Sequence, residues 1–171
     1  MVDCLILGDS LAVGLGLARP DCEIAAVTGI TSDRYVQTFR GTRQAHIAII
    51  SLGVNDGDSV PTVDNLSVVR SRVSAETVYW LLTGGNARAR DAVRLVAGRF
   101  GDRLIDAAPL AGPDHIHPDH AGYELLAAET RGRTVEHVTQ PVASWALPNI
   151  NVWNGPNNLN GAPAPAAAQS R

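Results

Sequence analysis

The sequence contains no lysine, because all 14 of its basic residues are arginine. Schiff-base catalysis needs a lysine amine, and a phosphate-binding P-loop needs a lysine beside the phosphates, so both kinds of chemistry are excluded. The 17 acidic residues outnumber the basic ones and leave a net charge of −3. This balance gives no reason to expect a nucleic-acid partner or an anionic membrane surface.

Cysteine is scarce, since Cys4 and Cys22 are the only two. Two are too few for the disulfide framework of a small secreted domain. Cys4 falls in the first apolar run of the chain and Cys22 just before the second, so the two could lie on neighbouring strands. Because isolated cysteines behave as small buried hydrophobic residues, the favoured interpretation is a pair of buried free thiols.

Long apolar runs are also absent. No run approaches the roughly 20 residues of a membrane span, and the N-terminus lacks the basic start and apolar core of a secretory signal. We therefore expect no membrane span and a cytoplasmic protein by default, with non-classical export as the alternative. A chain of 171 residues, 45% apolar and 18% charged, is typical of one globular domain with a proper core.

Short apolar runs alternate along the chain with segments that carry apolar residues at helical spacing. The predicted strands cover residues 4–7, 23–27, 46–52, 77–82 and 103–106. The predicted helices cover residues 11–18, 31–40, 62–73 and 87–98, and a final helix ends near residue 129. Nearly all-apolar strands that alternate with helices indicate a parallel sheet covered on both faces. The predicted fold class is α/β, a three-layer α/β/α domain with a five-stranded parallel sheet.

The composition changes near residue 139. We predict one domain over residues 1–138, followed over residues 139–171 by a C-terminal arm and a tail of linker composition that ends in alanine and proline. Trp145 and Trp153 are unusual in a pure linker, so we expect residues 142–153 to pack back on the domain. A tail of this kind commonly joins a further domain.

The first predicted strand stops at Gly8, and Asp9 and Ser10 follow where the next helix should start. This order leaves a hydroxyl group at the carboxyl end of the sheet, which is where open α/β sheets bind ligands. Taken alone, such a serine most often only caps a helix. We predict that Ser10 is a nucleophile, provided that other strand ends supply its partners.

Acyl transfer through a serine needs a base, a group that orients the base, and donors for the oxyanion. His117 can be the base, and Asp114, three residues earlier, can orient it. The backbone N–H groups of Ser10 and Gly29 and the side-chain amide of Asn55 can be the oxyanion donors. Taken one at a time, each of these residues is explained better by a turn or a helix cap than by a catalytic role. Together, in this order at strand ends, they favour the catalytic interpretation.

Four segments resemble the signature blocks of the SGNH (GDSL) hydrolases. They are residues 8–11 (GDSL), 27–32 (VTGITS), 53–56 (GVND) and 114–123 (DHIHPDHAGY), and they occur in the family's order within about residues 3–130. The resemblance implies a flavodoxin-like sheet and a serine esterase or lipase mechanism. It also implies that Ser10 is the nucleophile, that Gly29 and Asn55 are oxyanion donors, and that Asp114 and His117 complete the triad.

One position departs from the family pattern, because His115 stands where the family usually has a small residue. His120 follows shortly after, and with Asp114, His117 and Asp119 these histidines could form a metal cluster. All of the ligands would come from one short loop, however. The favoured interpretation is therefore that His115 and His120 lie at the rim of the pocket, with no metal.

The sequence predicts a serine esterase that works through an acyl-enzyme on Ser10 without a cofactor. Short connections leave no room for a substantial lid, so we expect an open groove and a short acyl group, such as acetyl, on a larger alcohol such as a carbohydrate. Asp9 and Asp56 are predicted to support the Ser10 turn and Asn55. The alternatives are an acyltransferase, a non-catalytic binding module and a metal-dependent hydrolase built on residues 115–120.

Overall fold

A computed structural model describes residues 1–131, so the predicted boundary at residue 138 and the arm with Trp145 and Trp153 lie outside the described residues. Five parallel strands form one sheet in the order β2-β1-β3-β4-β5, which confirms the predicted fold class. The strands are β1 (Val2–Gly8), β2 (Glu23–Ala26), β3 (Arg43–Ser51), β4 (Val73–Leu82) and β5 (Arg103–Asp106). The helices are α1 (Ser10–Ala18), α2 (Ser32–Thr38), α3 (Thr62–Ser71), α4 (Ala87–Phe100) and α5 (His120–Thr130), with a short 3-10 helix at Ala108–Leu110.

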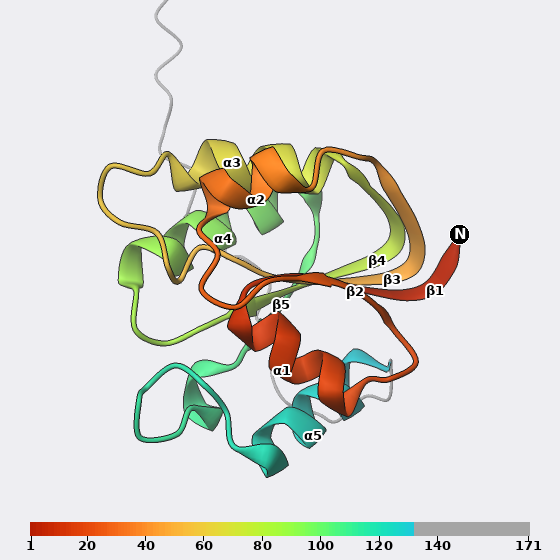
Figure 1. Ribbon diagram of the computed structural model, residues 1–171, viewed down its shortest axis with the longest axis vertical. Helices are drawn as coiled ribbons and strands as arrows, with labels where there is room; N and C mark the ends of the chain where they lie inside the picture. Colours follow the sequence, from red (N-terminus) through yellow and green to blue (C-terminus); the bar gives the residue numbers. More distant parts are fainter. Residues whose placement is uncertain (132–171) are drawn as a thin grey trace, which may run out of the picture.

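Helices cover both faces of the sheet. Helices α1 and α5 lie on one face, and α2, α3 and α4 lie on the other (Figure 1). Side chains of β1 alternate between the two cores, since Leu5 and Leu7 belong to one and Cys4 and Ile6 to the other. Burial on both faces explains why the strands are apolar without interruption. Within residues 1–131, no helix combines the length and apolarity that crossing a bilayer requires.

The strand order reverses direction at β1. The chain passes from β1 outward to β2 and then crosses back to β3 on the other side of β1. The connections that leave β1 and β3 therefore diverge to opposite faces of the sheet, as α1 and α3 do in Figure 1. In open α/β sheets the crevice at such a reversal is the usual ligand site. Ser10 and Asn55 follow the two strands that border it.

Strand β1 begins two residues earlier than the sequence predicts, at Val2, and two other strands begin three or four residues earlier. Strand β3 begins at Arg43 rather than at residue 46, and β4 begins at Val73 rather than at residue 77. Arg43 and Val73 lie opposite each other in the register. The side chains of Ser74 and Glu76 are exposed, so these strand ends lack the apolar pattern that marks a buried strand. Backbone hydrogen bonding between β3 and β4 determines where these strands begin. The hydropathy pattern of the sequence does not reveal that pairing.

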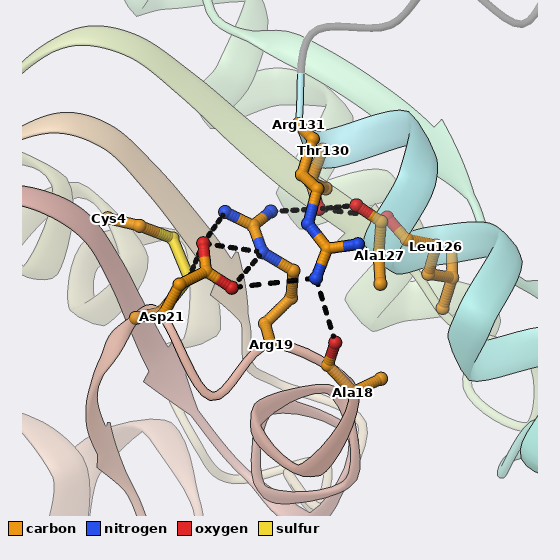
Figure 2. Close-up of a disulfide and its surroundings, with 9 residues drawn as sticks. Cys4, Ala18, Arg19, Asp21, Leu126, Ala127, Thr130 and Arg131 are labelled. Carbon is orange, nitrogen blue, oxygen red and sulfur yellow. Dashed lines mark hydrogen bonds and ion pairs between the residues drawn. A yellow bond between two sulfur atoms is a disulfide. The ribbon is translucent and has the colours of Figure 1, made fainter.

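Cys4 and Cys22 form a disulfide, so the expectation of two free thiols is wrong (Figure 2). The physical reason is the register between β1 and β2. Leu5 lies opposite Glu23, which places Cys4 beside Cys22 with their Cα atoms 4.5 Å apart. The sequence places both cysteines near strands, but it does not reveal which residues of the strands pair.

Arg19 joins the loop before β2 to the end of α5, next to the disulfide (Figure 2). Its guanidinium, with only 3% of the side chain exposed, donates to the Asp21 carboxylate at 2.8 Å and to Thr130 Oγ1 at 2.9 Å. The hydrogen bonds from Arg19 lower the pKa of Asp21 to about 2. Arg131 adds a hydrogen bond to the carbonyl oxygen of Ala18 at 3.2 Å. These contacts fasten α1 to α5 at the end of the sheet opposite to Ser10.

Reduction of the disulfide is expected to lower the free energy of unfolding by about 3 kcal/mol, because the bond closes a loop between residues 18 positions apart in the unfolded chain. Urea unfolding with and without a reductant measures the difference. The double variant C4A/C22A is the control, since its unfolding should not respond to the reductant. Identical wild-type midpoints in both conditions would show that the bond contributes nothing.

Candidate active site

Ser10 is the first residue of α1 and follows β1 directly. Strand β1 ends so close to β3 that a Cβ on Gly8, whose φ is +135°, would overlap the carbonyl oxygen of Ser51. The backbone N–H of Asp9 donates to the same oxygen at 3.0 Å. Glycine is therefore required where the chain leaves the sheet. This exit places Ser10 at the carboxyl end of the sheet, within the crevice beside β3.

Ser10, His117 and Asp114 form a continuous chain of hydrogen bonds. Ser10 Oγ lies 2.7 Å from His117 Nε2, and His117 Nδ1 lies 2.7 Å from Asp114 Oδ2. With the proton on Nδ1, His117 donates to Asp114 and accepts the hydroxyl proton of Ser10 at Nε2. This arrangement lets His117 remove the proton of Ser10 while Asp114 holds the imidazole in place and stabilises its charged form.

The loop around Asp114 fixes its carboxylate. Asp114 Oδ1 accepts the backbone N–H groups of Ile116 and His117, both at 2.9 Å. The hydrogen bond from the His117 side chain, together with these two, holds the pKa of Asp114 well below its usual range. Asp114 therefore stays ionised and remains an acceptor. The side chains of His117 and Asp114 are 41% and 51% exposed, so the site opens directly to solvent.

The loops that carry Gly29 and Asn55 meet at the same edge of the sheet. Asn55 Nδ2 donates to the carbonyl oxygen of Ile30 at 3.1 Å, which uses one of its two amide hydrogens and leaves the other free to donate. The backbone N–H of Val27 donates to the carbonyl oxygen of Gly8 at 2.9 Å and ties the Gly29 loop to the end of β1. Among residues 1–131, no group accepts a hydrogen bond from the backbone N–H of Gly29 or of Ser10. These groups are available to an oxyanion.

Asp56 lies buried beneath the Asn55 loop. Its Oδ1 accepts the backbone N–H of Ser32 at 2.7 Å, and its Oδ2 accepts the hydroxyl groups of Ser32 at 2.6 Å and Thr62 at 2.8 Å. Ser32 begins α2 shortly after Gly29. The carboxylate therefore ties the loop after β3 to the loop after β2. That Asp56 supports the activity of Asn55 stays a prediction.

Asn86 is a site residue whose position the sequence did not reveal. Asn86 stands directly before the helix predicted over residues 87–98 and caps α4, where its Oδ1 accepts the backbone N–H of Ala89. Its Nδ2 also donates to the carbonyl oxygens of Val54 at 3.3 Å and Asp56 at 3.1 Å. The cap therefore holds the backbone on both sides of Asn55. The sequence shows that an asparagine precedes a helix, but it does not show that this side chain contacts the loop of Asn55.

Asp9 is completely buried at the start of α1. Its Oδ1 accepts the backbone N–H of Leu11 at 3.1 Å and the hydroxyl of Ser51 at 3.0 Å. Its Oδ2 has no partner among the described residues. Burial raises the pKa of Asp9 to about 6, and the hydrogen bonds offset this only in part. Asp9 thus caps the helix that carries Ser10, and its importance for activity stays a prediction.

The variant Asp9→Asn is expected to remove a pH dependence of stability worth about 3 kcal/mol. The folded protein binds the Asp9 proton more tightly than the unfolded chain does, so the contribution of Asp9 is greatest below about pH 4 and is lost as the pH rises through about 6. Urea unfolding of wild type and variant at several pH values between these limits measures the effect. Asp3→Asn, at an exposed aspartate of β1, is the matched control. A stability difference between Asp9→Asn and wild type that is constant with pH would contradict the prediction.

His115 and His120 are exposed, and His115 is the only non-glycine residue with a positive φ, 61°, in residues 1–131. Within the same residues, the one group of three metal-ligating side chains that come close together is Cys4, Asp21 and Cys22, whose two cysteines form the disulfide. The loop of His115 and His120 therefore does not gather three donors in the described part of the chain.

Comparison with known proteins relates the chain to others by structure. No protein-family model matches it, and no curated protein matches its sequence. A member of the lipolytic G-D-S-L family from Veillonella parvula matches with a TM-score of 0.56 and 10% sequence identity, over 80% of this chain and 100% of that one. The C-terminal catalytic domain of peptidoglycan O-acetyltransferase A from Streptococcus pneumoniae matches with a TM-score of 0.49 and 16% identity, over 74% of this chain and 88% of that one. The chain has the fold of the G-D-S-L structures, which confirms the resemblance to the SGNH hydrolases at the level of the fold.

Proposed function

We propose that this protein is a serine esterase that removes a short acyl group, such as acetyl, from an ester of a larger alcohol. The observation that carries the proposal is the hydrogen-bonded chain from Ser10 through His117 to Asp114. It lies at the strand ends where the loops of Gly29 and Asn55 meet. The fold shared with the lipolytic protein from Veillonella parvula supports the hydrolase class.

In the first half of the reaction Ser10 Oγ attacks the ester carbonyl carbon as His117 Nε2 takes the hydroxyl proton. The carbonyl oxygen becomes an oxyanion, which accepts from the N–H groups of Ser10 and Gly29 and from the Asn55 amide. Removal of one such donor costs about two to three orders of magnitude in rate. The tetrahedral intermediate then expels the alcohol, which takes the proton from His117 and leaves the acyl group on Ser10.

In the second half a water molecule donates its proton to His117 and attacks the acyl carbon. The same donors hold the second oxyanion. Collapse of this intermediate releases the carboxylic acid and returns the proton to Ser10. Asp114 remains ionised throughout, because the hydrogen bonds from His117 and Ile116 keep its pKa low. The exposure of the His117 imidazole gives water direct access to the acyl-enzyme.

The shape of the described surface supports a short acyl group. A long acyl chain needs an apolar pocket beside the nucleophile. A groove of about 380 Å³ lies between α3 and α4, away from the triad, since no triad residue lines it. Its apolar lining includes Val60, Pro61, Val63, Ala92 and Leu95. The exposure of His117 and Asp114 supports a bulky alcohol, such as a carbohydrate, as the leaving group.

Ser10→Ala is expected to abolish hydrolysis of nitrophenyl acetate, because the acyl-enzyme cannot form. By the serine protease precedent the loss in kcat reaches about a millionfold. For the wild type, kcat/KM should be highest for the acetate ester and fall as the acyl chain lengthens. Ser74→Ala is the matched control, because Ser74 is an exposed serine at the start of β4, at the opposite end of the sheet.

Equal rates of nitrophenyl acetate hydrolysis by wild type and Ser10→Ala would contradict the serine mechanism. If a chelator then abolished the activity, the metal-dependent alternative would be favoured. A folded wild type that neither turns over esters nor reacts with a fluorophosphonate would favour the binding module. Product analysis in the presence of sugar acceptors separates hydrolysis from acyl transfer, because both begin with the same acyl-enzyme on Ser10.

The disulfide bears on the compartment in which the protein works. The Cys4–Cys22 bond is buried beside β1, and such bonds persist in oxidising compartments but are rare in a reducing cytoplasm. We propose that the protein acts outside the reducing cytoplasm, which differs from the default expected from the sequence. An acyl ester on an extracellular or cell-envelope polymer would be a substrate consistent with that location.

The redox state of the protein in its native cells tests this proposal. Acid-quenched cells are treated with a maleimide reagent of known mass under denaturing conditions. The oxidised protein is expected to take up no reagent, because both thiols are consumed in the bond. A sample reduced before labelling is the control and should gain two labels, one for each cysteine. Full labelling without prior reduction would place the protein in a reducing compartment.

A further inference from the structure

The turn after β4 supplies no group to the proposed chemistry, yet it contacts the loop that carries the base. A Cβ on Gly84 would overlap the carbonyl oxygen of His115 and would lie 3.2 Å from its carbonyl carbon. Both atoms belong to the backbone, so they cannot move aside as the end of a flexible side chain can. Any other residue at position 84 must therefore displace the backbone next to Asp114.

The loop that Gly84 contacts is joined by several hydrogen bonds of its own. The backbone N–H of Gly112 donates to the carbonyl oxygen of His117 at 2.7 Å, and the N–H of His115 donates to the carbonyl oxygen of Gly112 at 2.9 Å. Asp114 adds its two hydrogen bonds to the backbone that follows it. Because these bonds link both ends of the loop, a displacement at His115 is transmitted to His117.

His115 itself is held in an unfavourable conformation. Its φ of 61° lies in the left-handed region, which glycine adopts freely and histidine seldom does. The position therefore suits a small residue, which gives a physical reason for the small residue that the family usually has there. Such a conformation persists only where the surroundings hold it, and the backbone contact with Gly84 is one such restraint.

The same turn also holds the loop that carries the amide donor. The backbone N–H of Asn86 donates to the carbonyl oxygen of Gly84 at 3.0 Å, while the Asn86 side chain donates to the carbonyl oxygens of Val54 and Asp56. The turn of residues 83–86 thus lies between the base loop and the Asn55 loop and contacts both. Its position sets the spacing of the two loops on either side of Ser10.

Arg90 anchors this turn to the sheet. Its Nη1 donates to the carbonyl oxygens of Leu82 at 3.2 Å and Thr83 at 3.1 Å, at the end of β4. Both terminal nitrogens of the guanidinium also bind the carboxylate of Asp106, at 2.9 Å each, at the end of β5. A bidentate pair of this kind fixes orientation as well as distance. Because Arg90 holds the turn, the backbone of Gly84 cannot easily move away from the His115 carbonyl group.

We propose that Gly84 is a positioning residue, which acts through the backbone of His115 to set the place of the His117 imidazole relative to Ser10. The proposal rests on the proposed serine mechanism, because the quantity that it controls is the proton transfer from Ser10 to His117. Glycine is required at position 84 because only a residue without a Cβ lets the base loop approach closely enough for the 2.7 Å hydrogen bond.

The test is the variant Gly84→Ala, measured with nitrophenyl acetate. A displacement of about 1 Å in a catalytic group costs up to about 100-fold in rate, so kcat is expected to fall about 10- to 100-fold. KM should stay near the wild-type value, because Gly84 lies outside the predicted substrate contacts. Labelling of Ser10 by a fluorophosphonate should slow by a similar factor. Gly41→Ala is the matched control, since a Cβ on Gly41 would meet nothing within 4 Å.

The double variant G84A/H115G separates positioning from a general loss of structure. A glycine at position 115 can change its backbone angles freely, so the carbonyl group can turn away from the added methyl group and the loop can return. The double variant is expected to recover at least tenfold in kcat over Gly84→Ala. Should Gly84→Ala not fold, Arg90→Gln loosens the same turn without adding a Cβ, and kcat is expected to fall with KM unchanged.

The outcomes distinguish this proposal from the proposed function. Wild-type kcat in folded Gly84→Ala, while Ser10→Ala is inactive, overturns the positioning role alone. A loss in folded Gly84→Ala that H115G does not restore also overturns it, because the added methyl group would then act elsewhere. If Gly84→Ala does not fold, wild-type kcat in Arg90→Gln overturns it as well. Equal activity of Ser10→Ala and wild type overturns the serine mechanism on which the proposal rests.

Discussion

The candidate site depends on the hydrogen bond between Ser10 Oγ and His117 Nε2, which joins residues 107 positions apart in the chain. Ser10 begins α1, and His117 lies just before α5. The packing of these two helices therefore decides whether the hydrogen bond can form. Ala12 and Leu15 of α1 share one buried cluster with Leu126 of α5. Close packing of that kind fixes helix positions to a fraction of an ångström, which is the tolerance that the proton transfer requires.

The two aspartates near Ser10 show how the environment shifts the pKa values of identical side chains in opposite directions. Asp114 lies on an exposed loop, and hydrogen bonds lower its pKa, so it remains a charged acceptor for His117. Asp9 is buried, one of its oxygens has no hydrogen-bond partner among residues 1–131, and desolvation raises its pKa. A helix N-terminus favours an anion, but at Asp9 burial outweighs that effect.

The sequence predicts the sheet, its helices and the residues of the candidate site, because each depends on local pattern. Apolar runs mark the strands, and polar residues at the ends of those runs mark the loops that meet at one edge of a parallel sheet. Strand register is different, since it depends on which neighbour each residue faces. The disulfide of Cys4 with Cys22 and the early starts of β3 and β4 all follow from register, and the prediction failed at all three.

Contacts between loops are equally invisible in the sequence. Asn86 has the pattern of a helix cap, and only the fold places its second donor group against Val54 and Asp56. Gly84 has the pattern of a turn glycine, and only the fold brings the His115 backbone against it. Both residues act on loops that are neighbours in space and distant in the chain. Residue type alone therefore predicts the reacting groups better than it predicts the residues that position them.

The two ends of the sheet differ in the kind of interaction that they contain. At the end near the start of β1, the disulfide and the buried Arg19 bind strands and helices to one another by covalent and ionic contacts. At the end that carries Ser10, the structure contains His115 in the left-handed region and an oxygen of Asp9 that has no partner in the described part of the chain. A folded protein tolerates local strain only if other contacts supply the stability that the strain removes. The disulfide and the contacts of Arg19 therefore contribute stability that offsets the cost of these two features beside Ser10.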